Sequence, residues 1–392
     1  MMEFYLKTKE ECDKIVENSE GFFRADRVVE GYNVALYDYR LASISDFVDN
    51  EAFELRGLCF VEQPDGTWKR NILMQKFFNV NQTVGWMLED VQNKKITRVQ
   101  NKEDGSIISF VKFPNGKVRA KSKMSFESDQ AQMAQEIYDT NVEIKEFVNS
   151  CFEYNYVPIF ELVGFQNQIV LNYDMASELI LLQIRTKDGM YFTKQEIKNW
   201  IGDFNITVTE DFDVLGNNAL TDLLELKETS QDPIEGWVVT FEDGQMAKIK
   251  TNKYLELHGL IGPDAFRENL LVQSILSGSI DDVVSALVPG PKKDSILKME
   301  KSLSDHFNHL VVEFKELRRK YFQDFGENRK EFSLVYSPKG SNPAELFSGV
   351  MKTLKTSFRE VENTAEEQVK LHILTRCNSL GKAQDYLENL ND

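Results

Sequence analysis

The stretch Asn101-Lys102-Glu103-Asp104-Gly105-Ser106 leads directly into the apolar run 107–111 (IISFV), a predicted strand. It reads K-x-D-G. A lysine amine is protonated at neutral pH and becomes a nucleophile only where burial or neighbouring cations disfavour its charge. Asp104 could orient a hydroxyl or help to hold a hard metal ion, and Gly105 would let a ligand approach the backbone closely. A motif this short is also typical of an ordinary surface turn.

Basic residues surround this candidate nucleophile. Residues 94–123 contain nine Lys or Arg and two acidic residues, and hence a net charge of +7. The turn signal Pro114-Asn115-Gly116 predicts a hairpin whose returning strand, 117–123, reads KVRAKSK. Strand periodicity would place its four cations on one face, which suits contact with a polyanion. The alternative is a solvated charged face.

The composition of the whole chain is that of a soluble globular protein. Its 392 residues suggest about two domains, and 42% hydrophobic and 28% charged residues are ordinary values. The formal net charge of −17 argues against a surface coated with basic residues for indiscriminate nucleic-acid binding. The charged N-terminus lacks a signal-peptide core, no apolar run reaches membrane-span length, and the four cysteines form no C-x-x-C pair. We therefore expect a cytoplasmic protein without membrane contact.

Further candidate residues stand at the start of, or inside, predicted strands. Arg56-Gly57 opens an apolar strand, where the arginine suits a phosphate or a structural ion pair with Glu54 or Asp38. Lys76 lies near Phe78, a residue type more often found in cores. Three more signals are Glu161 in the apolar run 158–164, Glu235 before Gly236, and the pair Lys248 and Lys250 on one strand face. Each taken alone also fits an ordinary amphipathic or buried strand.

The last third changes character. Apolar residues repeat at three and four between 303 and 321 and between 347 and 358, and Ser341-Asn342-Pro343 is a helix-start signal. We therefore expect an α+β protein with an antiparallel, β-rich domain over 1–254 and an all-α domain over 255–392. The pair Asp281-Asp282 suggests either a second metal site or, preferably, a helix N-terminus.

The order of these motifs resembles that of the covalent nucleotidyltransferases, the superfamily of ATP-dependent ligases and mRNA capping enzymes. Within it the chain is most similar to the phage RNA ligase 1 family. The phrases that carry this likeness are KFFN at 76–79, KEDGS at 102–106, KSK followed by SDQA in 121–131, IVLNY at 169–173 and IEGW at 234–237. The resemblance covers about residues 20–255.

The resemblance implies an enzyme that forms a lysyl-adenylate with ATP. Lys102 would attack the α-phosphate, Lys248 and Lys250 would grip that phosphate, and Asp104 would assist catalysis. The implied nucleotide-binding residues are Arg56, Lys76, Phe78, Gly105, Lys123, Glu161, Glu235 and Trp237. Of these, Glu161 would contact the ribose hydroxyls. Asp104 and Glu235 would bind or orient Mg²⁺, with Mn²⁺ as an alternative ion.

The adenylate would pass to an RNA 5′-phosphate, and a 3′-hydroxyl would then seal the strand. In this family the helical domain typically selects a broken tRNA anticodon loop, so we expect RNA ends as partners of a monomeric repair enzyme. Rival members of the superfamily, DNA ligases and capping enzymes, usually carry a β-barrel after the Lys248-x-Lys250 strand, whereas helices are expected here. A protein that only binds RNA ends, or one that adenylylates another kind of target, is the further alternative.

Overall fold

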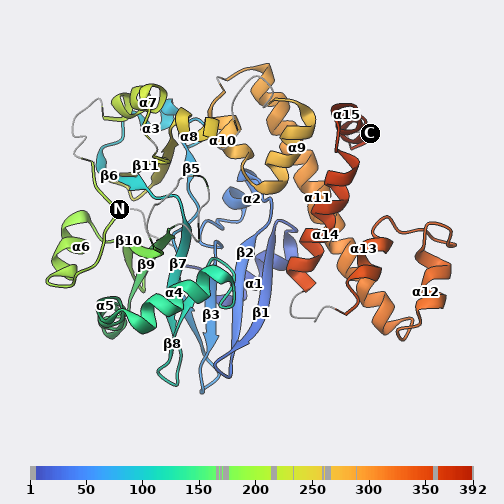
Figure 1. Cartoon of the computed structure of the whole chain (residues 1–392), viewed down its shortest axis with the longest axis horizontal. Helices are drawn as coiled ribbons and strands as arrows, with labels where there is room; N and C mark the ends of the chain where they lie inside the picture. Colours follow the sequence, from blue (N-terminus) through green and yellow to red (C-terminus); the bar gives the residue numbers. More distant parts are fainter. Residues whose placement is uncertain are drawn as a thin grey trace.

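The computed structural model describes residues 6–164, 167, 170, 176–212, 219–232, 234–257, 260, 266–287, 289–355 and 361–390. Its strands form three four-stranded sheets, and helices make up the chain that follows them (Figure 1). Every neighbouring pair of strands is antiparallel except β5 with β12. The expected α+β class is confirmed.

The first sheet, here called the N-terminal sheet, has the order β1-β2-β3-β4. Its strands are β1 (Phe22–Val29), β2 (Tyr32–Tyr39), β3 (Leu58–Glu62) and β4 (Trp68–Asn71). Helices α1 (Lys9–Asn18) and α2 (Ile44–Asp49) begin at capping boxes in which Thr8 and Ser43 accept hydrogen bonds from the first helical turns. Residues 32–39 (YNVALYDY), whose alternation is typical of a strand, form β2.

Two further sheets carry the motif residues. The central sheet has the order β10-β9-β7-β8, and the lysine sheet has the order β5-β12-β11-β6. The strands of the central sheet are β7 (Ser106–Lys112), β8 (Val118–Lys121), β9 (Tyr156–Val163) and β10 (Glu178–Thr186). Those of the lysine sheet are β5 (Phe78–Asn79), β6 (Ile96–Lys102), β11 (Gly236–Phe241) and β12 (Met246–Lys250). The K-x-D-G turn therefore links the lysine sheet to the central sheet.

Short helices cover these sheets: α3 (Leu88–Val91), α4 (Asp129–Thr140), α5 (Val142–Glu153), α6 (Lys194–Ile201) and α7 (Ala219–Thr229). Residues 127–151 have the composition of a helix throughout, but the chain divides them into α4 and α5. Asn141 stands between them in an extended conformation, and its side chain accepts a hydrogen bond from the backbone N–H of Ile144. Asparagine competes for backbone hydrogen bonds in this way, which favours a helix cap over a continuous helix.

The expected helical region follows β12. It contains α8 (Asn252–Leu257), α9 (Glu268–Ser277), α10 (Ile280–Ser285), α11 (Pro291–Gln323), α12 (Arg329–Tyr336), α13 (Phe347–Lys352), α14 (Val361–Arg376) and α15 (Leu380–Asn389). The boundary expected at residue 254 falls inside α8. The helix start expected at 341–343 is four residues early, since α13 begins at Phe347.

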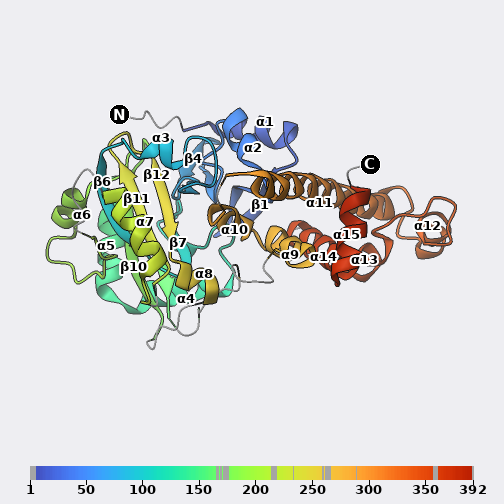
Figure 2. The same ribbon diagram turned by 90° about the horizontal axis from the view of Figure 1, so that it is seen from above.

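The long helix α11 runs through the helical region, and α10 lies where this region meets the sheets (Figure 2). The apolar residues of α11 at three- and four-residue spacing, Leu303, Phe307, Leu310, Phe314 and Leu317, are buried in one core with α9, α14 and α15. No helix among the described residues is long and apolar enough to cross a membrane.

A buried ion pair joins the central sheet to the loop between α2 and β3. Arg185, in β10, has no exposed side-chain surface and donates to both carboxylate oxygens of Glu54, at 2.9 and 2.6 Å. The same guanidinium donates to the carbonyls of Gly189 and Leu73. Because every charge here has a partner, burial of the pair is tolerated, and the pair holds the loop before β3 against the central sheet.

Candidate active site

Lys102 ends strand β6, and its register neighbour on β11 is Gly236. The residue before that glycine, Glu235, is almost completely buried, and its Oε2 accepts a hydrogen bond from Lys102 Nζ at 2.7 Å. Gly236 has a positive φ of 146°, and a Cβ there would collide with the carbonyl of Ile249. Only glycine therefore lets β11 begin beside β12 with Glu235 turned towards Lys102.

Lys248 and Lys250 join Lys102 on the same face of the lysine sheet. Gly236 pairs with Lys250 on one side and with Lys102 on the other, while Val238 pairs with Lys248. Residues paired across strands share a face, so the three amines project together. Lys250 Nζ lies 2.9 Å from Glu235 Oε1, and Glu235 thus bridges two lysines. Burial opposes its ionisation, but Lys102 and Lys250 outweigh that cost and lower its pKa.

The N-terminus of α10 supplies two further carboxylates to this lysine face. Asp281 Oδ2 is 2.8 Å from Lys248 Nζ, and Asp282 Oδ2 is 2.8 Å from Lys250 Nζ. Asn79, on β5, also donates to Asp282 Oδ1 at 3.1 Å. Both aspartates lie in the first turn of α10, which confirms the interpretation as a helix N-terminus. Asp281 and Asp282 thus neutralise Lys248 and Lys250. These are the two cations that the resemblance places at the α-phosphate of ATP.

Asp104 is buried and has two hydrogen-bond donors of its own. Its Oδ1 accepts from the Tyr254 hydroxyl and its Oδ2 from the backbone N–H of Val170, both at 2.8 Å. Gly105 does not have a positive φ. Instead, a Cβ there would collide with the carbonyl of Leu162, so the glycine admits strand β9 close to the turn. Sequence reasoning missed Tyr254, since a lone tyrosine in a short helix gives no chemical signal.

Glu161 lies in β9 with 9% of its surface exposed, opposite Ile107 in the register of β7 and β9. Burial raises the pKa of this carboxyl to about 8, the positive charge of Lys102 partly opposes the shift, and Glu235 adds to it. The site thus contains a carboxyl whose burial favours its neutral form. A neutral carboxyl can both donate and accept a hydrogen bond.

Two predicted phosphate-binding cations and one aromatic residue line a cavity of about 780 Å³ between the sheets and the helical region: Lys76, Lys123 and Phe78. Tyr39 and Asp281 line it too. Lys76 Nζ donates to the Tyr39 hydroxyl at 3.3 Å, and Lys123 Nζ lies 4.7 Å from the centre of the same ring. Burial opposes ionisation of Tyr39, but Lys76, Lys123 and Arg56 outweigh it and lower its pKa to about 8. The sequence did not single out Tyr39.

Arg56 does not adopt the ion pair that was its structural alternative. It donates to the carbonyl of Met74 at 3.3 Å, whereas Glu54 is bonded to Arg185 and Asp38 lies 2.9 Å from Lys123. Because the backbone oxygen takes only part of its donors, the guanidinium keeps donors for a ligand.

Trp237 does not lie with the other predicted nucleotide-binding residues. Trp237 stands between Gly236 and Val238 on β11, so its side chain lies on the opposite face of the lysine sheet. There it packs in a core with Val99, Leu223 and residues on both neighbouring strands. Its indole centre is 6.1 Å from that of Phe212. The structure assigns it to packing beneath α7.

Arg119 and Lys121 share a face of β8 as the periodicity predicts, but the cations over 117–123 already have partners within the protein. Strand β8 ends at Lys121, which is fully buried and donates to the carbonyls of Gly57, Ser122 and Lys123. Lys117 and Arg119 both bind Glu30, at 2.7 and 2.8 Å. Glu30, at the turn between β1 and β2, thus forms ion pairs with two of the four cations.

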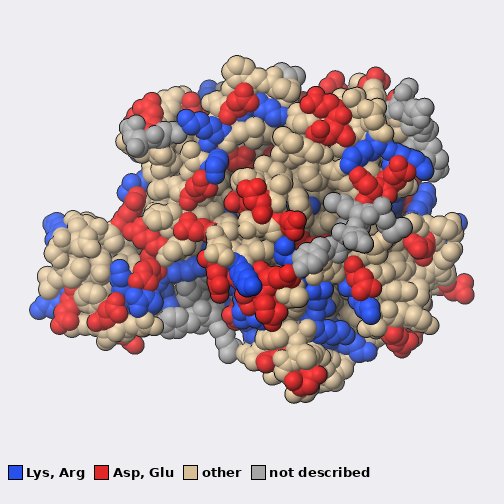
Figure 3. Space-filling model, turned by 180° about the vertical axis from the view of Figure 1, so that it is seen from behind, with Lys and Arg blue, Asp and Glu red and all other residues tan. Residues whose placement is uncertain are grey.

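Basic and acidic side chains are interspersed over the face shown in Figure 3, without a single large basic patch. Among the residues that the structure describes, no group of three or more His, Cys, Asp and Glu side chains is placed to hold a metal ion. Most of the motif at 169–173 lies outside the described residues.

An RNA ligase family model matches residues 54–254, a range that includes all the catalytic and nucleotide-binding residues implied by the resemblance. A Thermovibrio ammonificans protein assigned as an RNA ligase is 22% identical over 320 residues, 80% of each chain.

Two solved structures are similar over part or most of the chain. An archaeal ATP-dependent RNA ligase has a TM-score of 0.48 and 11% identity, with 78% of this chain and 80% of that chain covered. A Naegleria gruberi RNA ligase with PPi has a TM-score of 0.39 and 19% identity, with 47% of this chain and 57% of that chain covered.

Proposed function

This chain belongs to the RNA ligase family, and we propose that it uses ATP to join an RNA 5′-phosphate to an RNA 3′-hydroxyl through an adenylate on Lys102. The observation that carries the proposal is the placing of Lys102, Lys248 and Lys250 on one sheet face around buried Glu235. A concentration of amines beside one nucleophile suits phosphoryl transfer, in which a protein mainly supplies position and positive charge.

The reaction has three transfers. Lys102 Nζ, without its proton, forms a P–N bond to the α-phosphorus of ATP while pyrophosphate leaves. An oxygen of the RNA 5′-phosphate then attacks the same phosphorus, the P–N bond breaks, and the AMP moves to the RNA end. Finally the 3′-hydroxyl loses its proton, attacks the RNA 5′-phosphorus and expels AMP.

The residues around Lys102 divide these tasks. Glu235 holds the Lys102 amine at 2.7 Å and so fixes the position of the nucleophile. Phosphate groups that reach Lys248 and Lys250 would replace Asp281 and Asp282 as their anionic partners, since phosphate and carboxylate bind the same ammonium donors. Glu161 would contact the ribose hydroxyls, and Arg56, Lys76 and Lys123 would meet phosphates. Phe78 lines the same cavity.

A metal ion bound directly by Asp104 and Glu235 does not fit this arrangement. Both oxygens of Asp104 accept hydrogen bonds, and both oxygens of Glu235 bind lysines. We therefore propose that magnesium or manganese enters bound to the phosphates of ATP. Mg²⁺ bound to a nucleotide keeps several water ligands and needs few protein carboxylates.

The family resemblance also supports a substrate class. We propose that the enzyme acts as a monomer in RNA repair and seals cleaved tRNA anticodon loops, with the helical region that follows β12 selecting the RNA. The absence of strands after Lys250 in the described chain favours this over a DNA ligase or capping enzyme.

Intact-protein mass spectrometry tests the proposal. Wild type and Lys102→Ala are incubated with ATP and Mg²⁺, and RNA with a 5′-phosphate and a 3′-hydroxyl is then added. We expect one adenylate on wild type only, and its loss as joined RNA appears. An adenylate that no RNA end discharges would favour a different target, and no adenylate with any nucleotide would favour a protein that only binds RNA ends.

A further inference from the structure

Three hollows follow one another along the contact between the N-terminal sheet and the helical region. The cavity of about 780 Å³ that contains Lys76 and Lys123 shares Phe23 and Arg40 with a second hollow of about 490 Å³. That hollow shares Arg24 and further residues with a third of about 950 Å³. We call this row of adjoining hollows the seam. Its inner end lies at the predicted nucleotide site and its outer end between β1 and α11.

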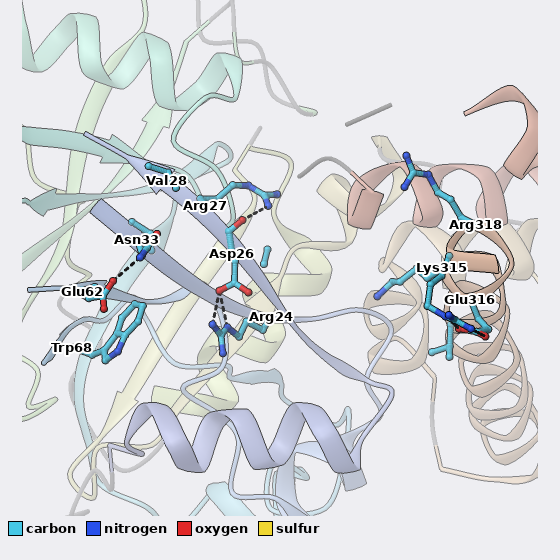
Figure 4. Close-up of a pocket in the computed structure, with 14 residues that line it drawn as sticks. Arg24, Asp26, Arg27, Val28, Asn33, Glu62, Trp68, Lys315, Glu316 and Arg318 are labelled. Atoms are coloured by element: carbon cyan, nitrogen blue, oxygen red, sulfur yellow. Dashed lines mark hydrogen bonds and ion pairs between the residues drawn. The ribbon is translucent and has the colours of Figure 1, made fainter. Parts of the chain in front are cut away.

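The outer end of the seam is basic although the chain as a whole is acidic. Its lining includes five Lys or Arg and three Asp or Glu, against a net charge of −17 for the protein. Arg24 and Arg27 come from β1, and Lys315, with two arginines, comes from α11. Figure 4 shows the two walls facing each other, with Lys315 projecting from α11 towards the sheet. Cations on both walls suit a polyanion that lies between them.

The carboxylates at this end are already bonded to neighbours. Asp26 Oδ1 accepts from the Arg24 guanidinium at 2.6 and 2.8 Å, and Glu62 Oε2 accepts from an asparagine at 2.6 Å. Glu316 forms two hydrogen bonds of 2.7 Å with Arg319.

Arg27 differs from these pairs. It donates to the backbone carbonyl of Asp26 at 2.9 Å, and no carboxylate within the described ranges pairs with it. Its guanidinium therefore keeps donors in the fork geometry that binds phosphate.

Apolar groups stand among these cations. Trp68 lines the outer hollow, and Val28 and Val312 are 47% and 41% exposed there. Single-stranded RNA binding typically combines cations for the backbone with apolar or aromatic surfaces for the bases. Further inwards Arg40 is buried, with its guanidinium 4.8 Å from the centre of the Phe23 ring. The seam therefore offers phosphate and base contacts beyond the nucleotide site.

We propose that the seam is the path of the RNA strand, which leaves the nucleotide site past Arg40 and binds at its outer end through Arg27 and Lys315. This inference rests on the proposed function, because it takes RNA as the substrate. It assigns the recognition of the RNA backbone beyond the sealed end to β1 and α11 together.

The test is the double variant Arg27→Glu with Lys315→Glu. Its control is Lys330→Glu with Lys339→Glu, which makes the same change of charge at exposed residues outside the three hollows. The probe is a fluorescent single-stranded RNA with a 5′-phosphate and a blocked 3′ end, and its affinity is measured by anisotropy at several salt concentrations without ATP.

We expect the seam variant to bind this RNA about tenfold more weakly than the control variant does. The plot of log affinity against log salt concentration should become less steep by about 1.4. The variant loses two phosphate contacts, and each contact to a single strand contributes about 0.7 to the steepness. KM for a 5′-phosphorylated dinucleotide donor, too short to reach the outer end, should stay unchanged.

Adenylate formation with ATP alone separates this inference from the proposed function and shows that the variants are folded. If wild type forms no adenylate, the proposed function fails, whatever the RNA affinity. If the seam variant forms the adenylate and binds RNA as the control does, the RNA path is refuted and the outer hollow is left for a protein partner. Equal weakening for the dinucleotide donor and the long strand would refute it as well.

Discussion

Glu161→Gln should remove a pH-dependent loss of stability. Glu161 is buried in β9, and this burial raises its pKa from 4.5 to about 8. The unfolded chain loses the proton near the lower value, whereas the folded protein keeps it until the higher one. Between them the folded state binds more protons, so the stability of wild type must fall as the pH rises through this window.

The size of the effect follows from the two pKa values. One pKa unit corresponds to about 1.4 kcal/mol, and integration from about pH 5 to about pH 8 gives a loss of about 3 to 4 kcal/mol from this single group. Glutamine has nearly the same shape and no charge. The variant should therefore gain stability relative to wild type as the pH rises, and the gain should vanish near the bottom of the window.

Urea unfolding at both pH values measures the difference between the free energies of unfolding of variant and wild type. Glu153→Gln is the matched control, because Glu153 ends α5 as an exposed residue. All other titrating groups are common to the compared proteins and cancel in the difference. A difference for Glu161→Gln that changes by less than about 1 kcal/mol between the two pH values would refute the argument that burial holds this carboxyl protonated.

Two further substitutions test the framework around the site. Arg185→Ala leaves Glu54 buried without its partner and should lower the free energy of unfolding, measured with urea, by about 3 to 5 kcal/mol. Arg319→Ala breaks an exposed pair and should lower it by less than about 1 kcal/mol. Equal losses for the two variants would contradict the argument. Gly105→Ala forces a methyl group against the Leu162 carbonyl and should slow adenylate formation at least about tenfold, because Lys102 lies three residues before it in the same turn. An unchanged rate of adenylate formation by mass spectrometry would show that the turn has room for the side chain.

Local patterns predicted much of the β-rich region. Residues 32–39 have the residue pattern of a strand, and their limits match β2, although both faces of β2 are buried: Ala35 and Tyr37 lie in one core, and Val34 and Leu36 in another. Strand periodicity placed Lys248 and Lys250 on one face. The break at Asn141 was missed because hydrophobic periodicity continues through α4 and α5, while the cap depends on one side-chain hydrogen bond.

Charged residues were predicted less well than strands. The sequence indicated that Lys121 and Lys123 share a cationic face, but the carbonyl groups around Lys121 come partly from Gly57, and the partner of Lys123 is Asp38. These partners lie more than sixty residues away in the chain. Periodicity shows which side chains share a face and does not show what covers that face.

The sequence by itself determined the order of the strands and motifs, the identity of the candidate nucleophile and the change to helices after Lys250, because these depend on residue type and local spacing. Only the tertiary structure decided that Glu235 bridges Lys102 and Lys250, and that α10 brings Asp281 and Asp282 onto the lysine face. The physical reason is that the partner of a buried charge is set by which strands and helices become neighbours. That outcome reflects the packing of the whole chain.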